Sequence, residues 1–257
     1  MDMIKILLVL LSCLMFSIAY KKTSSKKKVL QSNCIMRMKN ISRLAKQELY
    51  ENQHEFYRQA YERGNTQWTG DGTPSSELVR TARKIKPKLK LKRVLDLGSG
   101  EGRHSIFLSR EGFRVIGLEF QEEALQRATG KRSRGLLYIR GDIFRIPLKP
   151  RSFDVLVDFG IFHHLRRKDT AIYLDLLSSM LVQGGYLILS CFSRKFKHAN
   201  GKLHKRGFMK HKNHYDRFST KTELRKVFEK RFQVLKINEI KSGFLDGLFQ
   251  LRGTGRK

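Results

Sequence analysis

The chain of 257 residues is long enough for one folded domain with a full core and a tail, because a domain takes roughly 100 to 200 residues. Its 53 Lys and Arg against 23 Asp and Glu give a formal charge of +30, which favours RNA, an acidic membrane surface or an anionic small substrate as a partner. A basic composition without a specific partner is the plainer alternative. Three scattered cysteines exclude a disulfide framework and indicate a reducing compartment.

An uncharged apolar segment, "ILLVLLSCLMFSIAY", occupies residues 6–20. As a helix it reaches only about 22 Å, short of the roughly 30 Å hydrocarbon core, so it is a marginal membrane span. Five lysines follow it within residues 21–28, and the positive-inside rule then places the rest of the chain in the cytoplasm, with the N-terminus as an anchor to the membrane. We therefore expect a hydrophobic anchor or signal-like segment at 1–20, a basic linker at 21–47 and one domain at 48–257.

Two other interpretations of the first residues stay open. Ser17-Ile18-Ala19 has the small-x-small pattern of a signal-peptide cleavage site. Alternatively, Met36 or Met38 begins the cytosolic protein, and residues 1–35 are an upstream start artefact.

Residues 32–63 are polar, with apolar side chains at helical spacing, and predict an amphipathic helix. The next stretch, "GNTQWTGDGTPSSELVR", gathers glycines and a proline and predicts a loop. Ser75 or Ser76 ends this loop, and either serine can cap a helix that runs to about Lys86.

Beyond Lys92, strand and helix patterns alternate. Strands are predicted at residues 93–97, 114–119, 135–140, 153–158, 186–191 and 232–240. Helices are predicted between the earlier strands, at 102–111, 122–129 and 170–181. This alternation predicts βαβ units, and hence an α/β fold with a mainly parallel sheet covered on both faces.

The run "VLDLGSGEGRH", residues 94–104, places three glycines directly after the first strand. Glycine accepts a positive φ and has no side chain, so a ligand can approach the bare backbone there. Gly98, Gly100 and Gly102 are spaced G-x-G-x-G, and an arginine stands where a dinucleotide fingerprint has its third glycine. Asp96 beside the turn repels a pyrophosphate but favours a cationic or amine-bearing ligand. The pattern predicts a nucleotide-like cofactor and disfavours an NAD oxidoreductase.

Residues 94–102 resemble the first motif of the class I S-adenosylmethionine-dependent methyltransferases, D/E-x-G-x-G-x-G. "LVQGGYLILSCF" resembles the turn and fifth strand of the same fold. The resemblance implies a Rossmann-like, doubly wound, mainly parallel seven-stranded sheet. It also implies S-adenosylmethionine as the cofactor, and a methyltransferase activity by in-line displacement.

Further motifs follow in the family's order, and the resemblance assigns them roles. Glu119 in "VIGLEF" stands where the family places the acid that pairs with both ribose hydroxyls, and Asp142 in "RGDIFRIPL" matches the acid that accepts from the adenine amino group. Ile143 offers the adenine its backbone and an apolar face, and Asp158 in "FDVLVDFGIFHHL" is expected near the methionine portion. The expected cofactor-binding set is Asp96, Gly98, Ser99, Gly100, Gly102, Glu119, Phe120, Asp142, Ile143, Asp158 and Trp68.

The segment around Trp68, the chain's single tryptophan, is similar to the lead-in "Y-x-x-G-x-x-x-W-x-x-G-x-P-S-x-E-L" of methyltransferases related to the thiopurine and tellurite-detoxifying enzymes. In those relatives it folds over the cofactor, so Trp68 is expected to cover the methionine or substrate side. Plain packing of the loop against the sheet is the alternative for Trp68. Gln67, where those relatives often carry proline, departs from the pattern.

The sequence names no catalytic residue. A sulfonium is already an activated methyl donor, so positioning carries most of the catalysis. An oxygen or nitrogen acceptor would need a base such as His164 or Asp158, whereas a sulfur or selenium acceptor would not. His163 and His164 also suit a structural role at a helix start, and His104 a packed or capping role. No metal site is expected.

Residues 193–231 form a basic insert with 14 Lys and Arg and only three acids. Aromatic side chains interleave with the charges, as on a surface that grips RNA, although a merely solvated face has the same composition. The most favoured acceptor is a small molecule; RNA methylation through this insert and a non-catalytic cofactor-binding adaptor remain alternatives. The acceptor and the oligomeric state stay open.

Overall fold

The computed structural model describes residues 50–64, 66, 68, 70–131, 133–197, 207–211 and 214–253. Contacts divide the chain into two units, Met1–Asn52 and Gln53–Lys257, and the second unit holds the sheet. The predicted segment at 1–20 and linker at 21–47 lie outside the described residues. Within the part of the chain that the structure describes, no helix combines the length and the apolar composition that crossing a bilayer requires.

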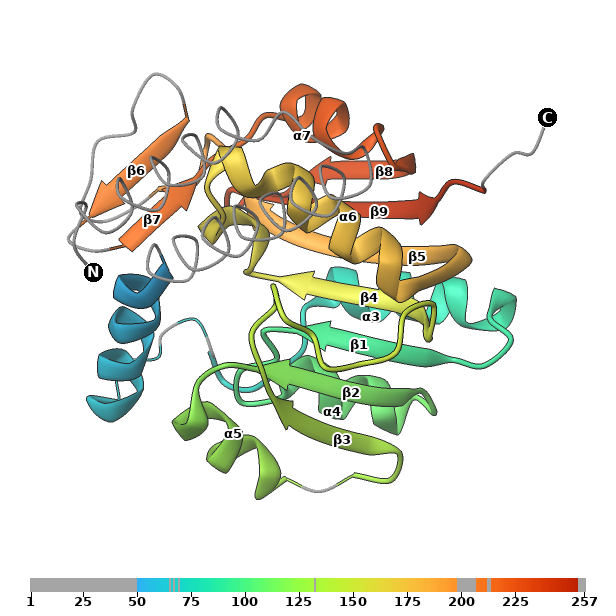
Figure 1. The fold of residues 1–257 in the computed structure, drawn as a ribbon, viewed down its shortest axis with the longest axis horizontal. Helices are drawn as coiled ribbons and strands as arrows, with labels where there is room; N and C mark the ends of the chain where they lie inside the picture. The colour runs from blue at the N-terminus through green and yellow to red at the C-terminus, as the bar shows by residue number, and fades with distance from the viewer. Residues whose placement is uncertain are drawn as a thin grey trace, which may run out of the picture. The chain divides into compact units, whose positions relative to one another are not determined.

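Seven strands form one twisted sheet in the order β3-β2-β1-β4-β5-β9-β8 (Figure 1). β1 pairs in parallel with β2 and β4, and β9 pairs antiparallel with both β5 and β8. The predicted mainly parallel, seven-stranded α/β sheet is therefore confirmed. The strands span β1 Arg93–Leu97, β2 Arg114–Glu119, β3 Leu136–Arg140, β4 Phe153–Phe159, β5 Leu181–Phe192, β8 Phe232–Glu239 and β9 Phe244–Leu251.

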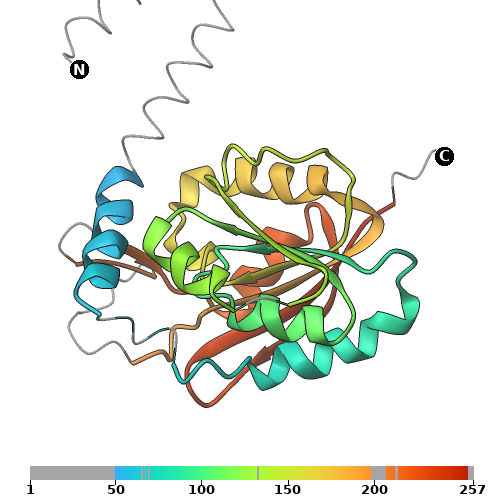
Figure 2. The same cartoon turned by 90° about the horizontal axis from the view of Figure 1, so that it is seen from below.

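Helices cover both faces of the sheet: α3 and α4 lie on one face and α6 on the other (Figure 2). A further helix over residues 50–62 precedes them. A separate hairpin of β6 (Phe208–His211) and β7 (His214–Arg217) follows β5. The helices span α3 Ser76–Ile85, α4 Arg103–Arg110, α5 Glu122–Thr129, α6 Thr170–Met180 and α7 Lys221–Phe228, with 3-10 turns η2 Lys86–Lys88, η3 Phe162–His164 and η4 Arg167–Asp169.

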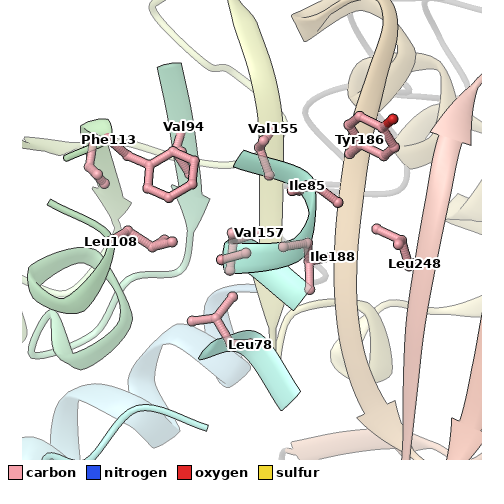
Figure 3. Packing of buried hydrophobic residues seen from close by; sticks show 12 residues of the cluster. Leu78, Ile85, Val94, Leu108, Phe113, Val155, Val157, Tyr186, Ile188 and Leu248 are labelled. Atoms are coloured by element: carbon pink, nitrogen blue, oxygen red, sulfur yellow. The ribbon is translucent and has the colours of Figure 1, made fainter. Parts of the chain in front are cut away.

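An apolar cluster joins α3 and α4 to one face of the sheet (Figure 3). Alternate residues of the central strands supply it, because successive side chains of a strand point to opposite faces. On the other face, Phe228 of α7 stacks on Phe249 of β9, with ring centroids 4.6 Å apart. Each fully buried Leu, Ile, Val or Phe contributes about 1.5–3 kcal/mol. Strands buried on both faces explain why the predicted strands read as nearly continuous apolar runs.

The predicted strand at 186–191 is the second half of the longer β5, whose pairing with β4 is irregular between Phe153 and Val155. The basic insert at 193–231 contains two kinds of structure: the β6–β7 hairpin, and α7, whose Leu224 and Phe228 are buried as part of the core. β9 has no counterpart among the strands expected from the sequence.

Candidate functional site

The glycine turn, residues 98–102, joins β1 to α4 at the carboxyl edge of the sheet. A side chain at its first glycine would overlap Ile161, and one at its third would overlap Tyr138, so protein packing occupies those sides of the turn. A Cβ at Gly100 would meet the Tyr61 hydroxyl at 3.4 Å, an ordinary contact distance. The structure thus leaves Gly100 as the place where a ligand can approach bare backbone. The φ angles are 64° at Gly98, 55° at Gly100 and 82° at Gly102.

Glu119 ends β2 directly beside this turn. Its Oε2 accepts a 2.9 Å hydrogen bond from the Gly100 N–H, and its Oε1 accepts from the N–H groups of Phe120 and Gln121, both at 2.8 Å. Burial raises the pKa of Glu119, and the three backbone donors oppose that rise. A carboxylate can accept about four hydrogen bonds, so Glu119 can also accept from ligand hydroxyls, beside or in place of these backbone N–H groups.

Asp142, Phe120 and His54 gather near the ends of β2 and β3. The Phe120 and His54 rings stack with centroids 3.7 Å apart, and 37% of Phe120 is exposed. Burial lowers the pKa of His54, and the nearby Asp142 carboxylate opposes that shift. Asp142 Oδ1 accepts from the Phe144 N–H at 2.8 Å, and Ile143 lies half-buried between them. A flat aromatic surface therefore lies close to a carboxylate at this edge.

Asp96 and Ser99 lie inside the protein at the end of β1. Asp96 Oδ2 accepts a 2.6 Å hydrogen bond from Ser105 Oγ, which ties β1 to α4. Burial raises the pKa of Asp96 to about 7, while the Ser105 hydroxyl opposes the rise. Ser99 donates its N–H to the Leu118 carbonyl at 3.0 Å, and its Oγ is buried with no hydrogen-bond partner in the described part of the chain.

Asp158 ends β4 and is fully buried. Its carboxylate accepts from the Tyr173 hydroxyl at 2.6 Å and from the N–H groups of Ile161, at 2.8 Å, and Phe162, at 3.1 Å. Burial raises the pKa of Asp158 to about 6 in spite of these donors. The observed geometry makes Asp158 an anchor for η3, the 3-10 turn that carries His163 and His164.

Trp68 lies beside two tyrosines of the helix over residues 50–62. Its ring meets those of Tyr57 and Tyr61 edge-on, with centroids 5.2 and 5.8 Å away, and its Nε1 donates to the Tyr61 hydroxyl at 3.4 Å. Because Tyr61 also faces Gly100, Trp68 is connected to the glycine turn through one side chain. With 40% of its surface exposed, Trp68 is not a core residue.

Three polar side chains from distant segments meet at η3. The Tyr57 hydroxyl lies 2.6 Å from His164 Nε2, and His164 Nδ1 lies 2.8 Å from Asp216 Oδ1. Asp216 comes from β7 and is 2% exposed. The neighbouring His163 is buried, and its ring stacks on Phe192 with centroids 3.8 Å apart.

The structure brings Glu119 to Gly100, Asp142 close to Phe120, and Trp68 towards the glycine turn. Asp96 and Asp158 instead bond protein groups, so a direct cofactor contact by either stays a prediction. Sequence reasoning missed His54, Tyr61 and Asp216. Asp216 carried one weak signal, since it is one of three acids in a basic segment. Tyr61 is the first residue of the lead-in motif around Trp68, which gave it no role, and His54 carried no signal.

The residues 88–236 match the family model described as "Methyltransferase domain". An uncharacterised methyltransferase of Geobacillus sp. (strain WCH70) is 28% identical over 119 residues, which cover 45% of this chain and 56% of that protein. A tRNA U34 carboxymethyltransferase of Aliivibrio salmonicida is 32% identical over 108 residues, covering 39% of this chain and 32% of that protein. The chain thus aligns with about half or less of the length of these relatives.

Solved structures share the fold. The crystal structure of Burkholderia thailandensis 1,6-didemethyltoxoflavin-N1-methyltransferase, with bound 1,6-didemethyltoxoflavin and S-adenosylhomocysteine, superposes with a TM-score of 0.65. The superposition covers 80% of this chain and 90% of that one, at 18% sequence identity.

Proposed function

Because this chain belongs to the methyltransferase domain family, as a class I S-adenosylmethionine-dependent methyltransferase, we propose that it methylates a small-molecule acceptor at the carboxyl edge of β1 to β4. Open α/β sheets bind ligands at this edge. When bound, S-adenosylmethionine supplies a methyl group on a positively charged sulfur. The chain's own side chains hold the reactants in line and exclude water, which is worth roughly 7–11 kcal/mol.

The hydrogen bond between Glu119 and Gly100 carries this proposal. It places a carboxylate next to the glycine of the turn at which an added Cβ overlaps no protein atom, and such a carboxylate suits a ribose with two hydroxyl donors. Phe120 and Ile143 offer apolar surface for the adenine, and Asp142 an acceptor for its amino group.

Two observations support a small acceptor. Tyr57, Tyr61 and Trp68 form an aromatic cover beside the glycine turn, which narrows the approach to it. Figure 1 shows the helix of residues 53–62 and the β6–β7 hairpin beyond the arrowheads of β1, β2 and β4. We expect elements in this position to hinder a structured nucleic acid more than a small molecule.

RNA is the second candidate acceptor, favoured by the charge of +30 and by the tRNA-modifying relative. Two aromatic side chains of the basic insert, however, are engaged in the protein: Phe218 is 1% exposed, and Phe196 stacks on Phe192 with centroids 4.2 Å apart. Bases stack on exposed rings, so these two cannot serve as a platform. Binding of a labelled oligoribonucleotide that falls steeply with salt would favour RNA.

Equilibrium binding of S-adenosylhomocysteine by calorimetry tests the cofactor site. We expect the parent to bind and Glu119→Ala to lose about 100-fold or more in affinity, since ligand hydroxyls would lose a charged acceptor. Glu122→Ala, which removes an exposed carboxylate three residues away, is the matched control and should bind like the parent. Equal affinities for the parent and Glu119→Ala would count against the proposed site.

Incubation with methyl-labelled donor and fractionated cell extract identifies the acceptor class. Label in small solutes supports the proposal. Label in RNA supports the second candidate, and binding of S-adenosylhomocysteine without labelling of any fraction supports a non-catalytic adaptor.

A further inference from the structure

Tyr57, His164 and Asp216 form a row of close polar contacts that joins three separate elements. Tyr57 comes from the helix over residues 50–62, His164 from η3 and Asp216 from β7. The Tyr57 hydroxyl lies at hydrogen-bond distance from His164 Nε2, 2.6 Å. His164 Nδ1 and Asp216 Oδ1, 2.8 Å apart, form a close charged contact that lacks hydrogen-bond geometry. The first and last residues of the row, Tyr57 and Asp216, are 159 positions apart in the sequence.

The chemistry of the row fixes where its protons lie. An ionised carboxylate has no proton to donate, and its charge 2.8 Å from His164 Nδ1 favours the tautomer with the proton on Nδ1. The Nε2 of a neutral imidazole with this tautomer is an acceptor. The Tyr57 hydroxyl therefore donates to Nε2, and the Asp216 carboxylate stabilises charge on the other side of the His164 ring.

We propose that Tyr57, His164 and Asp216 form a proton relay that takes a proton from the methyl acceptor, and that the acceptor is therefore nucleophilic through an O–H or N–H group. This inference rests on the proposed methyltransferase function. A phenol oxygen both donates and accepts, so Tyr57 can receive the acceptor's proton while it passes its own to His164. Asp216 is a positioning residue, because it acts through His164.

The step balances in atoms and charge. The acceptor's oxygen or nitrogen forms a bond to the methyl carbon as the carbon–sulfur bond breaks, and that electron pair stays on sulfur, which becomes neutral. The acceptor's proton moves to the Tyr57 oxygen, and the Tyr57 proton moves to His164 Nε2. The resulting imidazolium faces the Asp216 carboxylate and then releases its proton to water.

The environment of Tyr57 favours a relay over an isolated tyrosinate. Desolvation raises the pKa of Tyr57 well above its ordinary value, and the charges of Asp216 and Glu119 add to the rise. Tyr57 therefore does not ionise alone near neutral pH, and it transfers a proton only when His164 accepts one. Tyr57 is also near the proposed donor site: its ring meets that of Trp68 with centroids 5.2 Å apart, and Trp68 donates to the Tyr61 hydroxyl that faces Gly100.

Nitrogen-15 NMR of the histidine rings in the parent, with S-adenosylhomocysteine added, tests the relay without any acceptor. We expect His164 to carry its proton on Nδ1. Tyr57→Phe should change the Nε2 signal, and Asp216→Asn should shift the ring towards the Nε2–H tautomer, as loss of the orienting carboxylate does in a hydrolase triad. A proton on Nε2 of the parent would overturn the relay.

Product analysis after labelling of cell extract tests the acceptor class. We expect the label on oxygen or nitrogen, with a rate at least about 100-fold lower in Tyr57→Phe and Asp216→Asn, the usual worth of acid–base catalysis. Affinity for S-adenosylhomocysteine should stay within about threefold of the parent's, a change of about 0.65 kcal/mol in binding free energy. Tyr186→Phe in the core and Tyr215→Phe next to Asp216 are matched controls and should retain the parent's rate.

The outcomes separate the two proposals. Label on sulfur, or an unchanged rate in Tyr57→Phe, overturns the relay and leaves the methyltransferase function standing. A parent that fails to bind S-adenosylhomocysteine overturns the proposed function itself. Binding without any labelled product contradicts both.

Discussion

Tyr173 and Asp158 form a 2.6 Å hydrogen bond in the protein interior, between α6 and the end of β4. The carboxylate is fully buried, so the loss of one donor is not made good by water. Tyr173→Phe should lower the free energy of unfolding by about 1.5–3 kcal/mol, the usual value for a hydrogen bond to a charged group. Urea unfolding followed by circular dichroism measures it.

Tyr138→Phe is the matched comparison for Tyr173→Phe. The Tyr138 hydroxyl is buried and has no hydrogen-bond partner within the described part of the chain. Its removal therefore takes away the desolvation penalty of an unpaired polar group. The variant should be as stable as the parent or more stable. Equal losses in the two variants would contradict the distinct roles of the two hydroxyls.

The buried carboxylates predict how stability changes with pH. The pKa values of Asp96 and Asp158, about 7 and about 6, lie above the ordinary 3.8, so the folded state binds these protons more tightly than the unfolded state. The contribution of these groups to the free energy of unfolding therefore falls as pH rises from about 4 to about 7. Asp96→Asn should show a smaller fall than the parent in urea titrations at several pH values. The exposed Asp175→Asn should follow the parent, and parallel curves for Asp96→Asn and the parent would refute the expectation.

Replacement by alanine should lower the free energy of unfolding by different amounts at two glycines that have nearly the same φ. Gly102 has φ 82° and Gly112 has φ 83°, but an added Cβ overlaps Tyr138 only at Gly102 and stays 3.6 Å from Lys86 at Gly112. Gly112→Ala should cost about 1–2 kcal/mol through backbone strain alone. Gly102→Ala should lower the free energy of unfolding further, because of the overlap with the Tyr138 hydroxyl. The double variant Gly102→Ala/Tyr138→Phe, which lacks that hydroxyl, should regain part of this additional loss. Thermal unfolding of the three variants measures this, and an equal cost at both glycines would show that the overlap is relieved without penalty.

Trp68 should report binding at the proposed site. It is the chain's single tryptophan, 40% exposed, and it lies next to Tyr61, which faces Gly100. S-adenosylhomocysteine should change the tryptophan emission along the same binding curve that calorimetry gives. Trp68→Phe should remove the signal and retain the fold. An emission that does not respond while calorimetry shows binding would place Trp68 away from the ligand.

Local patterns predicted much of the fold. β1, β2 and α5 begin and end at the expected residues, because each is a short segment bounded by turn residues. β9 was missed: Gly247 interrupts its apolar pattern, and a side chain there would meet the ring of Phe249. The β6–β7 hairpin was hidden because its charged residues suggested an exposed insert rather than strands.

For the site, the sequence indicated the glycine turn, Glu119 and Asp142, which are expected at strand ends from motif order alone. It did not indicate that Tyr57 and Asp216 meet at His164, because no periodic pattern relates three segments so far apart. Asp96 and Asp158 stand at the expected strand ends and are each bonded to protein groups, so their expected contacts with the cofactor stay a prediction.

The position of β9 between β5 and β8 also bears on how the chain folds during synthesis. β8 leaves the ribosome before β9, yet in the sheet it hydrogen-bonds only to β9, so it has no place to dock until the later strand has emerged. The first five strands can assemble earlier, while β5 waits with an open edge. Emerging chains halted before residue 244 should therefore expose that edge, a template on which other nascent chains can add a strand and aggregate.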